Sequence, residues 1–332
     1  MNIRQLKQFI AIARAGTISR AATSQNISQP ALTRSLKNLE ADLGVELLER
    51  RANGVFLTSY GEHLLQYAQC MVSDAERVRQ EITAMQQGLR GRLNVGVGPA
   101  FSTRLLPKAL QRLTTDGAQL EIKLRESFVE DLCAQLRSGE LDVVLSLFPD
   151  TLETDDLEFA QLCTVDSVVV AASDHPLANI RQLTRQQLAQ CNWVIADQVH
   201  ANHSFREYLN RCTVPQHVHH VRANSLRLIK SLVVGSSYLS ILPTMLIEEE
   251  LRLGQIKRLN APVRSLVSMG GMAWRKSGHR SAALREFVDI VKQEAKAHRI
   301  FQRLSTQVRH HYRSVSLKPL SPIYRAIYSA AF

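Results

Sequence analysis

Apolar residues near the amino terminus recur with the period of an α-helix in three successive runs. The runs use Leu6, Phe9, Ile10 and Ala13, then Ile18, Ala21 and Ala22, and then Leu32, Leu36, Leu39 and Leu43. Each apolar stripe needs a partner surface to cover it. The pattern therefore predicts three short helices that share one core.

The third run has clear helix boundaries. Ser28 is a good N-cap, Pro30 falls in the first turn, and Gly44 stands where the helix ends. The face opposite the leucines holds hydrogen-bond donors, and no acid precedes Glu40: Gln29, Thr33, Arg34, Lys37 and Asn38. Most such faces are simply solvated. Because Thr17 caps the preceding helix and only a short turn separates the two, the pair predicts a helix-turn-helix, whose second helix can enter the major groove of DNA.

A hairpin is expected after the three helices. The stretch LLERRANGVFLTSYG places strand-like residues on both sides of Asn53 and Gly54, a dipeptide that favours a tight turn. Arg50 and Arg51 precede this turn. Three helices followed by a basic hairpin predict a winged helix-turn-helix domain.

A long helix is expected from its cap at Thr58 to about residue 87, with Gly88 and Gly91 to end it. Its apolar positions alternate spacings of four and three, the heptad pattern of a coiled-coil seam: Leu64, Ala68, Met71, Ala75, Val78, Ile82 and Met85. We favour a dimer seam, because a two-fold partner would also place two recognition helices on neighbouring half-sites. The alternative is a helix packed on its own domain.

From Arg92 onward the pattern changes to alternating strands and helices. The segments RLNVGVG and QLEIKLRE alternate with period two, and LDVVLSLF, SVVVAA and WVIAD are continuous apolar runs that suit buried parallel strands. The segments VEDLCAQLRSG and NSLRLIKSLVVG place apolar residues on one helical face and end in glycine. This predicts an α/β architecture, in which ligands bind at the carboxyl ends of the strands.

The positive charge of the chain is concentrated at its two ends. The formal net charge of the 332 residues is +11. Residues 1–39 carry six basic residues and no acid, and residues 295–332 carry seven basic residues and no acid. At the amino-terminal end the basicity coincides with the predicted helix-turn-helix, which indicates a polyanionic partner.

Length and hydropathy limit the class of protein. A chain of 332 residues suits two or three domains. It has no stretch of about eighteen uncharged, mainly apolar residues, and QFIAIARAG is too short for a signal peptide. We therefore expect a cytoplasmic protein with no membrane partner.

The motifs of the common enzyme classes are missing from the sequence. It contains no GxSxG, Walker loop, GxGxxG or HExxH, so we expect no enzymatic activity and no cofactor. No carboxylate or thiol completes a familiar ligand set around the histidines, so we expect no metal site at His200, His203, His217, His219 and His220. The five cysteines lack close pairs. A redox switch between Cys191 and Cys212 stays open, although buried free thiols are commoner.

The amino-terminal sequence closely resembles the winged helix-turn-helix of LysR-type transcriptional regulators, over LKQFIAIARAGTISRAATSQNISQPALTRSLKNLEADLGVELLERRANGVFLTSYGEHLL. Later segments are similar to the effector domain of that family: GRLNVGVG, LRSGELDVVLS, AASDHPLA and LVVGSSYLSILP. That domain resembles periplasmic solute-binding proteins, with two lobes around a cleft. The resemblance extends over residues 1 to about 297.

The resemblance implies a multidomain α/β protein: a winged helix-turn-helix at 1–58, a dimerising linker helix at 59–89 and a two-lobed effector-binding domain at 92–300. One lobe would comprise 92–161 and 266–300, and the other 162–265. The implied function is sequence-specific binding of promoter DNA by a homodimer or homotetramer, modulated by a small molecule in the cleft. RNA polymerase is a further candidate partner. The alternatives are a constitutive or architectural regulator without an effector, and a redox-sensing regulator.

DNA contacts are expected from the polar face of the third helix and from the basic wing. The residues expected to face the groove are Gln29, Pro30, Thr33, Arg34 and Lys37. Gln29 can pair with adenine and Arg34 with guanine, whereas Lys37, Arg50 and Arg51 would hold phosphates. The helices that begin at Thr17 and Ser28 offer amide groups to phosphate. Many family members carry a basic residue near position 53, where this chain has Asn53, so the wing residue that contacts phosphate stays open.

Candidate effector-binding residues are expected in the cleft between the lobes. Ser102 and Thr103 begin a helix after the first strand, and they either present hydroxyl and amide groups to an anionic ligand or only cap the helix. By position the family's pocket would also use Phe128, Ser146, Leu147, His203 and Ser225. Some relatives specific for aromatic acids have an arginine where this chain has Leu147 or Phe148, so that ligand class does not carry over. We expect a small organic anion.

The basic extension at 301–332 has no counterpart in the family. Ser321 and Pro322 suit a helix start, and an apolar stripe follows them. The extension could dock on a neighbouring subunit, carry its basic residues to DNA, or remain a disordered tail.

Overall fold

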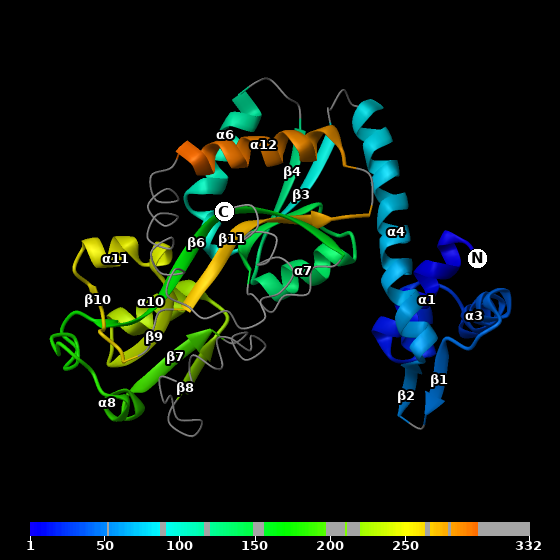
Figure 1. Cartoon of the computed structure of the whole chain (residues 1–332). Coiled ribbons are helices and arrows are strands. Elements are labelled where there is room, and N and C mark those ends of the chain that lie inside the picture. Colours follow the sequence, from blue (N-terminus) through cyan, green and yellow to red (C-terminus); the bar gives the residue numbers. More distant parts are fainter. Residues whose placement is uncertain are drawn as a thin grey trace, which may run out of the picture.

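The computed structural model describes residues 1–51, 53–86, 91–115, 120–148, 156–196, 210, 220–262, 266–277 and 280–297. Within these ranges a small helical domain with a hairpin, one long helix and a larger α/β domain follow one another along the chain (Figure 1). This is the multidomain α/β architecture that the sequence predicts. The extension at 301–332 lies outside the described residues, as do Cys212 and the histidines from 200 to 219.

The amino-terminal domain contains the three expected helices, α1 (Ile3–Ala15), α2 (Ile18–Ser24) and α3 (Gln29–Leu43). The side chains of Thr17 and Ser28 cap α2 and α3, and Gly44 ends α3 in the left-handed conformation, as predicted. Buried leucines of α3 pack against α1 and α2 in one core. Leu43 departs from the prediction, because it is 38% exposed. Leu47, after the turn, takes the buried place in the core instead.

The wing consists of β1 (Leu48–Arg51) and β2 (Gly54–Leu57), which pair antiparallel. The backbone N–H of Val55 donates to the carbonyl of Gly16 at 2.8 Å, so the wing is fixed to the end of α1. Gly54 has a φ of 138°, and a Cβ atom there would lie 2.7 Å from the carbonyl oxygen of Gly16. The Asn53 and Gly54 turn therefore needs its glycine.

The long helix α4 (Ser59–Gln86) has 28 residues and stands between the small domain and the α/β domain (Figure 1). Thr58 caps it as predicted, since the N–H of Gly61 donates to the Thr58 hydroxyl at 3.0 Å. A Cβ atom at Gly61 would lie 2.1 Å from the carbonyl oxygen of Leu47. Only glycine lets the first turn of α4 approach the wing so closely.

The described strands of the α/β domain form a sheet in the order β4-β3-β5-β11-β6-β9-β7-β8, with β10 paired to β6. Their bounds are β3 (Gly91–Val97), β4 (Leu120–Glu126), β5 (Val143–Phe148), β6 (Leu157–Ala172), β7 (Asn192–Ala196), β8 (His220–Ala223), β9 (Tyr238–Pro243), β10 (Ile256–Arg258) and β11 (Leu266–Arg275). The segment SVVVAA, predicted as a parallel strand, is the second half of β6 and pairs antiparallel with β9 and β10. A continuous apolar run indicates that both faces of a strand are buried. It does not indicate whether the neighbouring strands run parallel or antiparallel to it.

In the first lobe, helices pack on both faces of the sheet formed by β3, β4, β5, β11 and the first half of β6, although the outer end of β4 stays exposed. One face packs against α5 (Pro99–Ser102), α6 (Leu105–Thr115) and α12 (Ala282–Ala297), and the other against α7 (Val129–Arg137). Figure 1 shows α6 and α12 on the opposite side of the sheet from α7. Cys163 and Val165 of β6 belong to this core.

The second lobe is built on the other half of β6 with β7, β8 and β9. Its helical elements are α8 (Arg185–Ala189), α10 (Leu226–Val234), the 3-10 turn η2 (Thr244–Leu246) and α11 (Glu248–Arg252). Val169 and Trp193 face the α8 side, and Val170 and Val194 face the α10 side. Because neighbouring residues of a strand point to opposite faces, β6 supplies both cores. The two lobes therefore meet along β6 and β11.

Candidate nucleic-acid interface and interlobe pocket

The polar face of α3 is directed away from the rest of the molecule. Gln29, Pro30, Arg34 and Lys37 are exposed, and Thr33 is half-buried. Figure 1 shows α3 on the side of the small domain opposite the α/β domain. In the described ranges no acid pairs with Arg34 or Lys37. Two cations and two small polar side chains are thus presented on one accessible helix.

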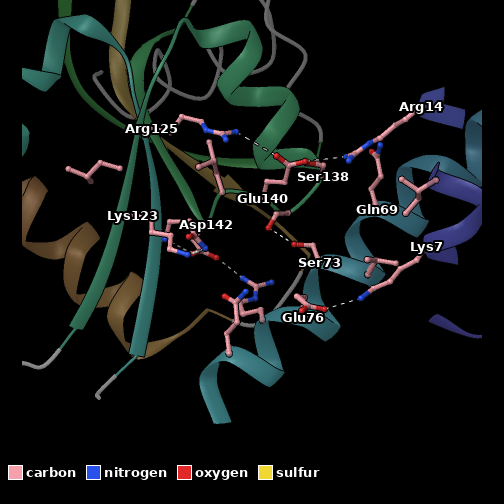
Figure 2. Close-up of a pocket in the computed structure, with 18 residues that line it drawn as sticks. Lys7, Arg14, Gln69, Ser73, Glu76, Lys123, Arg125, Ser138, Glu140 and Asp142 are labelled. Atoms are coloured by element: carbon pink, nitrogen blue, oxygen red, sulfur yellow. Dashed lines mark hydrogen bonds and ion pairs between the residues drawn. The ribbon is translucent and has the colours of Figure 1, made fainter. Parts of the chain in front are cut away.

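Two other cations of this domain point the opposite way. Lys7 pairs with Glu76 of α4 at 3.1 Å, and Arg14 pairs with Glu140 of the α/β domain at 3.2 Å (Figure 2). Arg4 and Arg20 stay exposed. The basic charge of the domain is therefore divided between a free surface around α3 and the contact with α4 and the α/β domain.

The wing carries Arg51 close to an acid and an aromatic ring. Its guanidinium lies 2.9 Å from a carboxylate oxygen of Glu49 and 4.9 Å from the ring centre of Phe56. Arg50 belongs to β1, and its side chain is outside the described part of the chain. These contacts hold Arg51 over the face of the hairpin that carries Glu49 and Phe56.

An apolar stripe runs along α4 and stays exposed in the single chain. Its members are Tyr60, Tyr67, Met71, Val78, Ile82 and Met85, and Val78 and Met85 are 54% and 75% exposed. Ala68 of the predicted seam is fully buried and Leu64 half-buried, because both pack into the core of the small domain. Tyr67 takes the place of Ala68. The shift follows from the packing of Ala68 against the small domain, which removes it from the exposed stripe.

A cavity of about 170 Å³ lies between the two lobes. Its first-lobe wall comes from the starts of α5 and α7 and the end of β5, with Pro99, Phe128, Val129, Glu130, Ser146 and Leu147. Its second-lobe wall includes Ala196, Leu226, Ile229, Ile241 and Leu246, and Ser167 and Ser268 come from the connecting strands. The described lining residues are mainly apolar, and their polar side chains are three hydroxyl groups and one carboxyl group.

Comparison with known proteins assigns both parts of the molecule. Residues 3–62 match the family model "Bacterial regulatory helix-turn-helix protein, lysR family". Residues 86–296 match the model "LysR substrate binding domain". The chain belongs to the LysR family of transcriptional regulators. It is a DNA-binding regulator with an effector-binding domain. In the described residues, no helix is long and apolar enough to cross a membrane.

Individual relatives match this LysR-family chain over most of their length. The Hca operon transcriptional activator HcaR of Escherichia coli is 29% identical over 298 residues, which are 88% of this chain and 98% of that one. The dual regulator OxyR of the same organism is 29% identical over 258 residues, 75% of this chain and 81% of that one. The structure of full-length CbnR in complex with its target DNA matches with a TM-score of 0.57 and 24% sequence identity. The match covers 89% of this chain and 100% of the CbnR chain, so the two proteins share the same fold.

The cavity contains part of the effector site predicted for this LysR-family chain. Phe128, Ser146 and Leu147 line it. Ser102, Thr103 and Ser225 are not among its described lining residues: the Ser102 hydroxyl donates to the carbonyl of Pro99 at 3.2 Å, and Ser225 caps α10. Thr103 is exposed. Predicted residue His203 lies outside the described residues.

Among the described lining residues, Glu130 is a charged group that the sequence prediction missed. It is half-buried in the first turn of α7 and lines the cavity. Burial raises the pKa of its carboxyl, an effect reduced by its own backbone N–H and increased by neighbouring Asp131. The segment VEDLCAQLRSG offered a signal, since the first turn of a helix that follows a strand lies at the ligand-binding edge of such sheets. Only the apolar face of that helix entered the sequence prediction.

The described cysteines of this regulator do not form a disulfide. Burial raises the pKa of Cys133 and of Cys163 to about 12, and it also raises the pKa of Cys191. The predicted partner of Cys191, Cys212, lies outside the described residues. Thiols with raised pKa values are poor nucleophiles near neutral pH, because little of the thiolate is present.

Proposed function

We propose that this regulator reads promoter DNA with α3, dimerises through α4, and responds to a small molecule held between the lobes of its α/β domain. The observation that supports DNA reading best is the accessible face of α3, whose cations have no acidic partner in the described ranges. A role as an enzyme is not proposed. A protein that binds promoter DNA works where that DNA is, in the bacterial cytoplasm.

The DNA contacts divide between bases and backbone. Gln29, Thr33 and Arg34 lie on the first two turns of α3, the part of a recognition helix that reaches base edges. Arg34 suits bidentate pairing with guanine, and Gln29 suits adenine. Lys37, Arg50, Arg51 and the amide groups at the starts of α2 and α3 hold phosphates and set the position of the helix.

The exposed stripe on α4 supports dimerisation. Large apolar side chains in a contiguous exposed row are rare on monomers and mark interaction surfaces. A two-fold partner would cover Tyr67, Met71, Val78 and Ile82 with the same residues of the other chain. The dimer would then carry two copies of α3 for two half-sites.

The core clusters support the domain boundaries in outline. We propose a DNA-binding domain at 1–58, a linker helix that begins at Ser59, and two lobes that exchange strands. Cys163 and Val165 pack in the first-lobe core, and Val169 packs in the second. The crossing point in β6 therefore lies between Val165 and Val169.

Helix α7 connects the proposed effector cavity with the DNA-binding part of the molecule. Val129 and Glu130, at its start, line the cavity. At its other end the Cys70 thiol of α4 donates to the carbonyl of Arg137 at 2.8 Å, and the Ser73 hydroxyl donates to the carbonyl of Gly139. The helix has nine residues, so its end at the cavity and its end at α4 lie about 14 Å apart along its axis.

The turn after α7, residues 138–142, borders a polar cavity of about 700 Å³ between α4 and the first lobe. Across this cavity Arg77 of α4 pairs with Asp142 at 2.9 Å, and Glu140 lies between Arg14 and Arg125 at 3.2 and 3.7 Å (Figure 2). Gly139 has a φ of 78°, and a Cβ atom there would lie 2.7 Å from the Ser73 hydroxyl. The turn is therefore fitted closely to α4.

A ligand that moves the start of α7 would shift this turn, and with it α4 and Arg14. Helices transmit such shifts because they move as rigid elements. We therefore propose that effector binding alters the placement of the DNA-binding domains through α7. This route requires no contact between the ligand and the DNA-binding domain.

Selection of bound duplexes from a random-sequence library tests the proposed function. The full chain should enrich a sequence with two related half-sites, centred one helical turn of DNA apart or a multiple of it. Arg258→Ala, an exposed arginine of the second lobe, is the control and should enrich the same sequence. Recovery of no common sequence would overturn sequence-specific DNA binding, and recovery of a single half-site would overturn the dimer.

A further inference from the structure

We infer that the effector is a small primary amine with an apolar body, bound as its ammonium ion against Glu130. The inference rests on the proposed function in one respect, that the cavity between the lobes holds the effector. It replaces the small organic anion expected from the sequence.

The walls of the cavity define the body of the ligand. Phe128 and Leu147 from the first lobe and Ile229 and Leu246 from the second present apolar surface from both sides. A volume of about 170 Å³ is below the roughly 300–1,000 Å³ of pockets for drug-sized molecules. The ligand is therefore a small molecule whose bulk is hydrocarbon.

The polar groups of the cavity define its head group. Hydroxyl groups of Ser146, Ser167 and Ser268 can each donate or accept a hydrogen bond, so they do not choose a charge. The Glu130 carboxyl does distinguish between ligand charges, because its ionised form attracts a cationic head group and repels an anionic one. A carboxylate beside apolar walls loses hydration, and a cationic donor restores the lost free energy through a charge-assisted hydrogen bond. An anionic ligand would instead place a like charge beside it.

The helix starts around the cavity do not reverse this preference. The amino-terminal ends of α7 and α10 carry partial positive charge, which by itself favours anions. However, the first turn of α7 already holds two acids, Glu130 and Asp131, and the Ser225 hydroxyl accepts from the Leu228 N–H of α10 at 3.4 Å. The start of α7 is thus already matched by its own acids and the start of α10 by its own cap, so neither helix end requires an anionic ligand.

Thermal-shift and calorimetric titrations of the full chain test the inference. The probes are butylamine, cyclohexylamine and benzylamine, each matched with a carboxylate of the same body: pentanoate, cyclohexanecarboxylate and phenylacetate. We expect amines to raise the Tm and carboxylates to leave it unchanged. Glu130→Gln should weaken amine binding about tenfold or more, the usual effect of losing a charged hydrogen-bond partner. Asp131→Asn is the matched control, since Asp131 accepts from the Ser127 hydroxyl at 3.0 Å and does not line the cavity.

The outcomes separate the inference from the proposed function. Binding of carboxylates in preference to amines, equal binding by Glu130→Gln, or no binding by any amine overturns the inference. Ala196→Phe fills the cavity from the second lobe and should abolish binding of whichever probe binds. A probe that binds this variant as well as the original chain shows that the effector site lies elsewhere, which overturns the proposed site itself.

Discussion

Arg34 and Lys37 lie three residues apart on the exposed face of α3, yet we assign them different tasks. Arg34 is nearer the start of the helix, where a side chain reaches base edges. Lys37 is one turn further along, where the groove wall and its phosphates are closer. A planar guanidinium distinguishes guanine by two hydrogen bonds, whereas an ammonium acts mainly as a point charge.

Lys37→Ala should therefore reduce the salt dependence of DNA binding. Each phosphate contact contributes nearly one unit to the slope of log affinity against log salt concentration, so the slope should fall by about one. The order of preference among DNA sequences should not change. Fluorescence anisotropy at several salt concentrations measures both, with Lys108→Ala, an exposed lysine of α6, as the control. An unchanged slope would place Lys37 outside the interface.

The buried thiols give a residue-level prediction about pH. Because burial raises the pKa of Cys133 and Cys163 to about 12, both should resist iodoacetamide in the folded chain near neutral pH and react after denaturation. The unfolded thiols ionise at lower pH than the folded ones. The free energy of unfolding should consequently decrease as the pH rises from about 9 towards 12. Mass spectrometry of the native chain follows the labelling, and rapid labelling of Cys163 would contradict its burial.

At the scale of elements, the stripe on α4 predicts how the chain assembles. Val78→Lys places a charge in the centre of the proposed two-fold interface, and each dimer loses two buried valines. Burying one valine is worth about 1.5 kcal/mol or more, so the dimer Kd should rise about a hundredfold or more. Sedimentation equilibrium measures this, with Leu228→Lys on α10 as a control of similar exposure, since Leu228 is 50% and Val78 54% exposed. A dimer unaffected by Val78→Lys would exclude the α4 stripe as the interface.

The contact between α4 and the turn at 138–142 can be measured directly. Arg77 and Asp142 are well covered, with side chains 21% and 7% exposed, and they join α4 to the first lobe. A double-mutant cycle with Arg77→Gln and Asp142→Asn in urea unfolding should give a coupling free energy of about 0.5–3 kcal/mol. The pair of Arg14 and Glu140 should couple more weakly, since its side chains are 62% and 45% exposed. A coupling near zero would mean that the ion pair of Arg77 and Asp142 does not help α4 to hold this turn in solution.

Elements with local signals could be predicted from the sequence, because each signal acts within a few residues. The caps at Thr17, Ser28 and Thr58 and the end at Gly44 lie where the sequence placed them. Properties set by tertiary packing could not be predicted. The stripe on α4 runs through Tyr67 because Ala68 is buried against the small domain, and nothing local distinguishes these two neighbours.

At the scale of the whole molecule, the cavity illustrates the same limit. Phe128, Ser146 and Leu147 were accessible to prediction because the family resemblance fixes their position in the first lobe. The opposing wall, with Ala196 and Ile229, comes from segments that meet the first lobe only after the strands cross between lobes. The charge of the site depends on Glu130, whose surroundings appear only when both walls are in place.

The central claim is that the exposed face of α3 reads the sequence of DNA. The most direct measurement is the ratio of affinities for the selected duplex and a scrambled duplex, for the original chain and for Arg34→Ala, with Arg258→Ala as the control. Loss of one bidentate base contact is worth about 1–3 kcal/mol, so Arg34→Ala should lower this ratio about tenfold or more while scrambled DNA is bound with similar affinity. The control should keep the ratio of the original chain. An unchanged ratio for Arg34→Ala would contradict the claim.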